Sequence, residues 1–400
     1  MGMDKSKILL FLGADASVFL DKPTTKQFKE ILSRKFEQLT KNKPDTEEIQ
    51  NLKILKGLLL FDKFEDIEYI FQFLDDLKKL DLSQIYKPES VLESYLNPCL
   101  QLYVNDEGKR HYEFREFFRK IESLLKILEN EVFDSYRLTE EIDEKEKQKE
   151  VYTKHFLKFL QKYSNDKIFI TTTNYDRIIE ETVQLEDDIY NLVDGFGFVR
   201  SKIKFNDENF EQIETNNINI ILFKLHGSLN WALDKSNDII YTREEKSNIP
   251  SIKHVLIYPT LSTKERKDEP FNSIMNRFKK CLEISNICIV IGFSFRDEYL
   301  TNHFRDSYKD KLLIVIDPNP FECIRNFFDI KHKEDLRCLK VHNNEIFLFR
   351  KDNFKFGLIK DYFNEKNIVN IIKNIETIIE NNDNIGFWTV HKIAKLSESI

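Results

Sequence analysis

Short runs of aliphatic and β-branched residues recur along the chain, and little polar alternation interrupts them. Runs of this kind are typical of strands that are covered on both faces, as in parallel sheets. Six runs are predicted to be strands: residues 8–12, 167–171, 218–224, 254–259, 287–293 and 311–317. Segments with helical spacing lie between most of them, and this alternation favours an α/β fold with a doubly wound parallel sheet.

One interval, residues 13–166, breaks this alternation and is predicted to be mostly helical. Within residues 113–132, apolar side chains recur at the i, i+3, i+4 and i+7 spacing of an amphipathic helix. We expect this stripe to face the core of a large helical insertion, roughly residues 45–165. The charged run at residues 140–150 is interpreted as a solvated helix face or a linker.

The pattern weakens beyond residue 330. Residues 345–351 are predicted to form a strand, and residues 364–382 an amphipathic helix with isoleucine and valine on one side. We therefore divide the chain into a main domain, residues 1–330, and a C-terminal helical/β extension, residues 331–400. The extension is expected to serve as a helical cap or an assembly surface.

Composition limits the classes of protein to consider. The chain has 400 residues, a formal net charge of −7 and a pI of about 5.8, which argues against a constitutive nucleic-acid binder. No apolar run approaches the roughly 20 residues that span a bilayer. The five cysteines are scattered and form no CxxC pair, which predicts reduced thiols in a cytoplasmic protein and offers no zinc site.

The first predicted strand ends in small residues, Gly13, Ala14 and Ser17, with Asp15 among them. Small side chains let backbone N–H groups approach a phosphate, although many strand-to-helix turns contain glycine and alanine for structural reasons. The following helix is predicted to begin after Thr24, because Thr24 and Gln27 have the spacing of a capping box.

Two further polar clusters follow predicted strands, where ligands bind in doubly wound sheets. The first contains Thr173, Asn174 and Asp176, which can also bond their own backbone in a turn. The second contains His226, directly before Gly227. A lone histidine is more often structural, but a ring at a tight turn can reach a ligand, and its usual pKa of about 6.5 suits proton abstraction.

The last two predicted strands also end in polar residues. Gly292 and Ser294 follow one strand, and Asp317 and Asn319 follow the next. A carboxylate at a strand end is a common partner for ribose hydroxyl groups. Taken alone, the sequence around Asp317 fits a simple turn at least as well.

These segments, taken in order, resemble the sirtuin-like superfamily, and most of all its bacterial branch that acts in anti-phage defence. The resemblance implies a Rossmann-like sheet that binds NAD. It assigns the pyrophosphate turn to Gly13, Ala14 and Ser17, with Thr173 also in the binding site. It implies catalytic roles for Asn174 and Asp176 at the nicotinamide ribose and carboxamide, makes His226 the catalytic histidine, and gives the adenosine side to Gly292, Ser294, Asp317 and Asn319.

Two departures from the family pattern matter. Sirtuin deacylases carry a zinc ribbon of paired CxxC motifs, and this zinc module helps to shape the groove for acyl-lysine. This sequence has no CxxC motif, so the resemblance does not extend to protein deacylation. The third residue of the first motif is usually glycine, whereas this chain has Asp15. A carboxylate facing the pyrophosphate would be repelled by roughly 1 kcal/mol or more, so we expect Asp15 to turn away, toward a helix start or a cation.

The resemblance implies an NAD⁺ hydrolase that needs no metal and releases nicotinamide and ADP-ribose. In this interpretation the protein is the effector of an antiviral defence system, and depletion of NAD causes abortive infection. A homo-oligomer or a partner such as a HerA-type ATPase is expected to restrain it. The alternative is a non-catalytic subunit that binds NAD or ADP-ribose within a defence complex. Neither a membrane nor direct nucleic-acid binding is expected.

Overall fold

A computed structural model gives the fold of this chain, which divides into two compact units. The main unit comprises residues 1–23, 136–257 and 263–400, and the helical unit comprises residues 24–135 and 258–262. The structure describes residues 8–14, 16–17, 22–41, 46–60, 67, 70–72, 74, 114–136, 157–163, 167–184, 187–199, 202–214, 216–242, 253–257, 268–307, 312–317, 320–327, 329 and 346–349.

The main unit is built on a seven-stranded parallel sheet, so the expected doubly wound α/β fold is confirmed. Every adjacent pair in the sheet is parallel. In spatial order the strands are β12 (Ile346–Phe349), β11 (Leu312–Ile316), β10 (Ile287–Ile291), β1 (Ile8–Leu12), β2 (Lys167–Thr172), β6 (Ile218–Lys224) and β3 (Tyr190–Val193).

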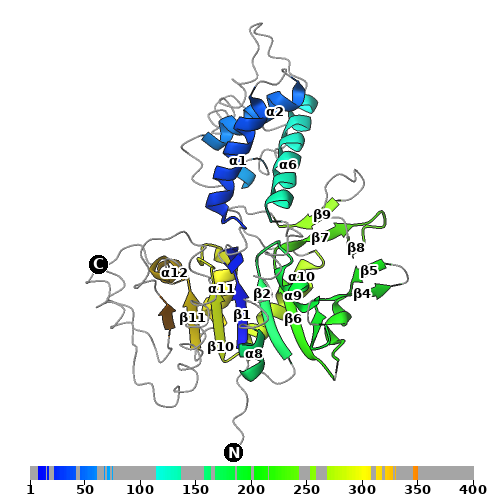
Figure 1. Cartoon of the computed structure of the whole chain (residues 1–400), viewed down its shortest axis with the longest axis vertical. Coiled ribbons are helices and arrows are strands. Elements are labelled where there is room, and N and C mark those ends of the chain that lie inside the picture. Colours follow the sequence, from blue (N-terminus) through cyan, green and yellow to red (C-terminus); the bar gives the residue numbers. More distant parts are fainter. Residues whose placement is uncertain are drawn as a thin grey trace, which may run out of the picture. The chain divides into compact units, whose positions relative to one another are not determined.

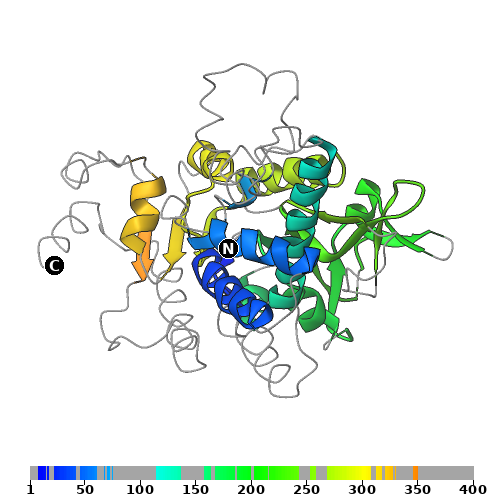
Figure 2. The ribbon, with the colours of Figure 1, turned by 90° about the horizontal axis from the view of Figure 1, so that it is seen from above.

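The prediction for residues 254–259 was wrong in one respect. This segment forms β9 (Lys253–Leu256), which belongs to a separate antiparallel sheet and pairs with β7. A buried apolar run does not distinguish parallel from antiparallel pairing. The strands of this second sheet, in spatial order, are β4 (Phe196–Val199), β5 (Lys202–Phe205), β8 (Ile239–Tyr241), β7 (Gly227–Leu233) and β9. Figure 2 shows these green strands on the side of the main unit opposite the orange α12 and β12.

Both faces of the sheet are buried at β1, β2, β6, β10 and β11, because alternate side chains of these strands enter two different cores. In β1, Leu10 belongs to one core and Leu9 and Phe11 to the other. The first core is covered by α8 (Lys158–Tyr163) and α9 (Ile178–Gln184). The second is covered by α10 (Phe271–Ile284), α11 (Glu298–Ser307) and α12 (Pro320–Phe327). This two-sided burial explains why the strands lack polar alternation.

The helical unit contains α1 (Thr25–Thr40), α2 (Glu47–Leu60) and most of α6 (Phe114–Tyr136). The predicted capping box before α1 is confirmed, because Thr24 and Gln27 exchange hydrogen bonds between side chain and backbone. In α6, Leu124 and Leu128 of the predicted stripe are buried. No described helix is long and apolar enough to cross a membrane. The predicted helix at residues 364–382 lies outside the described residues, and the division at residue 330 stays a prediction.

The strand order creates a topological switch point beside β1. From β1 the chain proceeds to β2 on one side of the sheet, and later returns to β10 on the other side. Figure 1 shows the blue β1 between these two strands. Ligands bind at such a point, beyond the carboxyl ends of the strands. Because the strands are parallel, the segments that follow β1, β2, β6, β10 and β11 all start at this same edge.

Candidate functional site

The turn after β1 lies against the end of β10 with no room for a side chain at its first residue. The Gly13 amide donates a hydrogen bond to the Ile291 carbonyl oxygen at 2.8 Å. A Cβ atom added to Gly13 would lie 2.3 Å from the Gly292 carbonyl oxygen. The chain then turns tightly, with the Ala16 amide 3.0 Å from the Gly13 carbonyl oxygen. The result is a close backbone approach of the kind that a phosphate site needs.

The segment after β2 is ordered by the last residue of that strand. The Thr172 hydroxyl donates to the Leu12 carbonyl oxygen at 2.9 Å and accepts from the Asn174 amide at 3.0 Å. The Thr173 amide also donates to the Leu12 carbonyl oxygen, at 3.2 Å. These bonds attach the segment 173–177, which we call the Asn174 loop, to the end of β1.

The side chain of Asn174 joins the two strand-end segments directly. Its Nδ2 group donates to the Gly13 carbonyl oxygen at 2.9 Å and to the Ser17 hydroxyl at 2.8 Å. Ser17 in turn donates to Asp176 Oδ2 at 2.7 Å. Because both hydrogens of the Asn174 amide are engaged in this way, its orientation is fixed and its Oδ1 atom is the part of the group suited to accept a hydrogen bond from a ligand.

Asp176 is buried beneath this network. Its Oδ2 atom accepts from Ser17, and its Oδ1 atom accepts from the Ile178 amide at 3.2 Å, at the start of α9. Burial raises the pKa of its carboxyl group, although Lys224, Ser17 and the Ile178 amide act in the opposite direction. In this geometry the carboxylate holds Ser17 and the start of α9, while the expected contact with a carboxamide stays a prediction.

His226 lies in the two-residue turn where β6 of the parallel sheet passes into β7 of the antiparallel sheet. Backbone hydrogen bonds on both sides of the histidine connect this region to the end of β2 and to the Asn174 loop. The Leu225 amide donates to the Thr172 carbonyl oxygen at 2.9 Å, and the Leu229 amide donates to the Tyr175 carbonyl oxygen at 3.1 Å. These two distant segments therefore lie side by side at one edge of the parallel sheet.

The imidazole of His226 faces a carboxylate that the sequence reasoning did not select. His226 Nε2 lies 3.4 Å from Asp297 Oδ2, and both side chains are less than a tenth exposed. Asp297 precedes α11, and its Oδ1 atom accepts from the Leu300 amide at 3.1 Å. At this distance the two groups face each other as an ion pair if the imidazole is protonated. The only sequence signal for it was an aspartate at a helix start, which usually indicates a cap.

The residues expected on the adenosine side lie at the same strand ends. Gly292 has a positive φ of 64° and Ser294 lies two residues beyond it, where its carbonyl oxygen accepts from the Asn326 side chain at 2.8 Å. Asp317 is buried at the end of β11. Ala14, beside Gly13, is half-buried. Asp15 and Asn319 lie outside the described residues.

A comparison with protein families gives a match for the segment that contains most of these site residues. Residues 168–327 match the SIR2-like domain family. The matched range starts in β2 and ends in α12, so it includes the Asn174 loop, the His226 turn and the end of β10. The Gly13 turn precedes the match and is connected to it through the side chain of Asn174. No curated protein matches the sequence.

Solved structures of Sir2 homologues align with most of the chain at low similarity. One is a crystal structure of a Sir2 homologue in complex with NAD, with 12% identity, a TM-score of 0.38, and coverage of 93% of this chain and 91% of that one. Another is a mutant Sir2 homologue in complex with ADP-ribose, with 12% identity and a TM-score of 0.38. This alignment covers 94% of this chain and 95% of that one. These scores are too low to support an argument about the fold, which is described here from the strand order and register of this chain alone.

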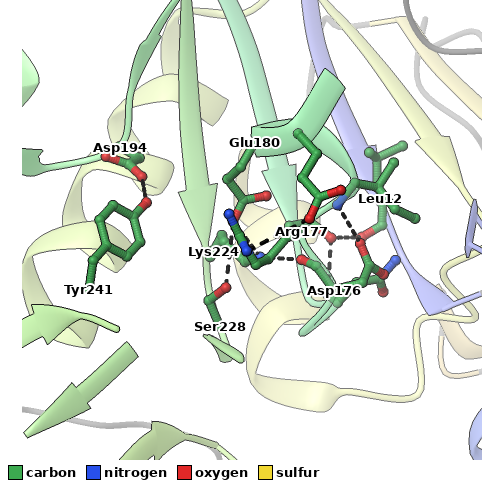
Figure 3. Close-up of polar contacts among 12 residues, drawn as sticks. Leu12, Asp176, Arg177, Glu180, Asp194, Lys224, Ser228 and Tyr241 are labelled. Carbon is green, nitrogen blue, oxygen red and sulfur yellow. Dashed lines mark hydrogen bonds and ion pairs between the residues drawn. The ribbon is translucent and has the colours of Figure 1, made fainter. Parts of the chain in front are cut away.

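Two charged residues behind the site were also missed by the sequence reasoning. Lys224 ends β6, and its Nζ atom lies 2.8 Å from Glu180 Oε1 and also donates to the carbonyl oxygen of Asp176. Figure 3 shows Lys224 between these two acceptors. A lysine within an apolar run was the available signal, but its partners belong to a segment more than forty residues earlier. Among the described residues, no group of three or more His, Cys, Asp or Glu side chains could hold a metal ion.

Proposed function

We propose that the protein hydrolyses NAD⁺ to nicotinamide and ADP-ribose. The observation that carries the proposal is the bonding of one amide, Asn174 Nδ2, to both Gly13 and Ser17, at the edge where the His226 turn also lies. The match to the SIR2-like domain supports an activity that binds or uses NAD. Neither the hydrogen bonds of Asn174 nor the family match favours NAD over another dinucleotide when taken alone, but the two together do.

The turn after β1 fits the pyrophosphate of such a substrate. Gly13 brings the backbone close to Gly292, and Ala14, Ala16 and Ser17 have small side chains. Backbone N–H groups in a turn of small residues can surround an anion without the desolvation of a charged side chain. The ends of β10 and β11, with Ser294 and Asp317, would then take the adenosine part.

The chemistry asks little of the protein beyond position and electrostatics. The bond between the nicotinamide nitrogen and ribose C1′ breaks, nicotinamide leaves as a neutral molecule, and water adds to the cationic C1′ centre. Asn174 Oδ1 would accept a hydrogen bond from that water. The imidazole of His226 would take its proton, directly or through a ribose hydroxyl, and pass it to solvent. Asp297 would orient the ring, and Asp176 would hold Ser17 beneath Asn174.

We place this activity in anti-phage defence, where the loss of NAD stops the infected cell. The basis for this part is the resemblance of the sequence motifs to the bacterial defence branch of sirtuin-like proteins. A homo-oligomer, with or without a HerA-type ATPase, would restrain the activity until infection. The test below is therefore made on the protein alone and together with the product of its neighbouring gene.

The test is the consumption of NAD⁺, measured by chromatography of nicotinamide and ADP-ribose. His226→Ala and Asn174→Ala should each lower turnover by about 10²–10⁴-fold, the usual loss for a general base or an equally essential group. His303→Ala and Asn276→Ala remove the same side chains from α11 and α10 and should keep the parental rate.

Two results would contradict the proposal. Parental turnover in either site variant would remove that residue from the mechanism. NAD or ADP-ribose that copurifies intact, with no turnover under any partner condition, would instead favour the non-catalytic binding subunit.

A further inference from the structure

A buried lysine lies behind the candidate site and has no part in the chemistry described so far. The side chain of Lys224 is 1% exposed, and that of its partner Glu180 is 7% exposed. Lysine is almost never buried to this degree unless it is paired. A second carboxylate, that of Asp176, lies close enough to be influenced by the Lys224 charge.

The contacts of the Lys224 ammonium group join three elements. Its Nζ atom donates to Glu180 Oε1 in α9 at 2.8 Å, and to the main-chain carbonyl oxygen of Asp176 in the Asn174 loop. Ser228, at the start of β7, completes the group by donating to the same Glu180 oxygen at 3.5 Å. Figure 3 shows these side chains directed toward one another from α9, β6 and β7.

The position of Lys224 in the chain relates these contacts to the site. Lys224 is the last residue of β6 and stands two residues before His226. The carbonyl oxygen that it binds belongs to Asp176, two residues after Asn174. One cation therefore connects the segment that carries the amide with the segment that carries the imidazole.

Stability alone does not account for such a pair. Removing two charges from water costs about as much as their attraction returns, and an apolar pair of similar volume is often equally stable or more so. An apolar pair could not, however, hold a main-chain carbonyl oxygen at a defined point. The lysine therefore contributes a fixed position of the Asp176 carbonyl oxygen rather than a gain in the free energy of folding.

We propose that Lys224 is a positioning residue for the reaction, which fixes the Asn174 loop against the His226 turn through the carbonyl oxygen of Asp176. This inference rests on the proposed function. It predicts that loss of the ammonium group displaces Asn174 relative to His226 and lowers kcat, because a displacement of about 1 Å can cost about 10²-fold in rate. Binding of the distant adenosine part should be affected much less.

The test uses the double variant Lys224→Met/Glu180→Met in the full chain. The single variant Lys224→Met leaves a buried, unpaired carboxylate and is expected to be strongly destabilised, so it cannot separate position from folding. The double variant removes both charges and should keep a melting temperature near that of the parent. Lys202→Met is the matched control, since Lys202 pairs with Asp234 at 2.7 Å in the antiparallel sheet and is half exposed.

Two readings are made on the parent, the double variant and the control. The first is NAD⁺ turnover, in which kcat of the double variant should fall by about 10–100-fold while KM changes little. The second is hydrogen exchange of the backbone amides in residues 173–178, which should become faster in the double variant alone. The control should match the parent in both.

The outcomes separate this inference from the proposed function. A folded double variant with parental kcat, or with parental exchange in residues 173–178, would overturn the role of Lys224. A parent that never consumes NAD⁺ would overturn the proposed hydrolysis, and with it any role of Lys224 in that reaction. The exchange reading would then still show whether Lys224 fixes the Asn174 loop.

Discussion

A pH-dependent stability is expected from one buried carboxyl group in the link between the two sheets. Asp194 follows β3 and precedes β4, and is only 5% exposed. Its Oδ1 atom accepts from the Phe196 amide at 3.1 Å, and its Oδ2 atom accepts from the Tyr241 hydroxyl. Burial is the main reason that the pKa of Asp194 is raised from 3.8 to about 6; the two hydrogen bonds lower the pKa but do not cancel this effect.

The sign of the effect follows from proton binding. Between pH 4 and pH 6 the folded protein keeps a proton on Asp194 that the unfolded chain releases. The stabilising contribution is therefore complete below about pH 4 and is lost as the pH rises through about 6. A difference of about two pKa units corresponds to about 3 kcal/mol in the free energy of unfolding.

Asp194→Asn removes the ionisable group and keeps the shape of the side chain. Urea unfolding is followed by the fluorescence of Trp231, which packs 5.1 Å from the ring of Phe196, in chains that also carry Trp388→Phe. Between pH 4 and pH 7.5 the parent should lose about 3 kcal/mol more than the variant, because all other titrating groups are common to both. A stability difference that does not change with pH, or that changes in the opposite direction, would refute the reasoning.

Substitutions at three further positions test the turn after β1. Gly13→Ala should lower the free energy of unfolding by about 3 kcal/mol in urea titration, because its Cβ atom would lie 2.3 Å from the Gly292 carbonyl oxygen and neither backbone can easily move; unchanged stability would contradict the close approach. Ser17→Ala should cost about 1–3 kcal/mol by the same titration, since the buried carboxylate of Asp176 loses a donor, whereas Ser17→Thr should keep most of it. Asp15→Gly should retain or improve the affinity for NAD in calorimetry, and a large loss would show that Asp15 takes a positive part in binding.

Continuous apolar runs made much of the fold predictable. In β1 and β10 every residue is buried, because both faces of the central strands are covered by helices. The same signal misplaced residues 254–259, because burial on two sides is also possible in an antiparallel sheet packed on a core. The short strands β5 and β8 were not expected, since a few residues with partly exposed side chains carry too little periodicity.

Some residues of the candidate site could be predicted from the sequence, and others could not. Gly13, Asn174 and His226 could be selected because each follows an apolar run, and the edge of a parallel sheet collects such positions. Lys224 and Asp297 could not, because their importance depends on partners far away in the chain. Nothing local distinguishes a lysine that binds a remote carbonyl oxygen from a lysine that reaches solvent.

The central claim is that one amide and one imidazole, from separate loops, meet at the same carbon atom of a bound dinucleotide. A crystal structure of the His226→Ala variant soaked with NAD⁺ tests it most directly, because slow turnover should preserve the substrate. We predict that ribose C1′ lies within reach of a water bound to Asn174 Oδ1, on the side where the imidazole stood, with the pyrophosphate over the Gly13 turn. A dinucleotide bound away from this edge of the sheet, or with C1′ remote from both residues, would contradict the account.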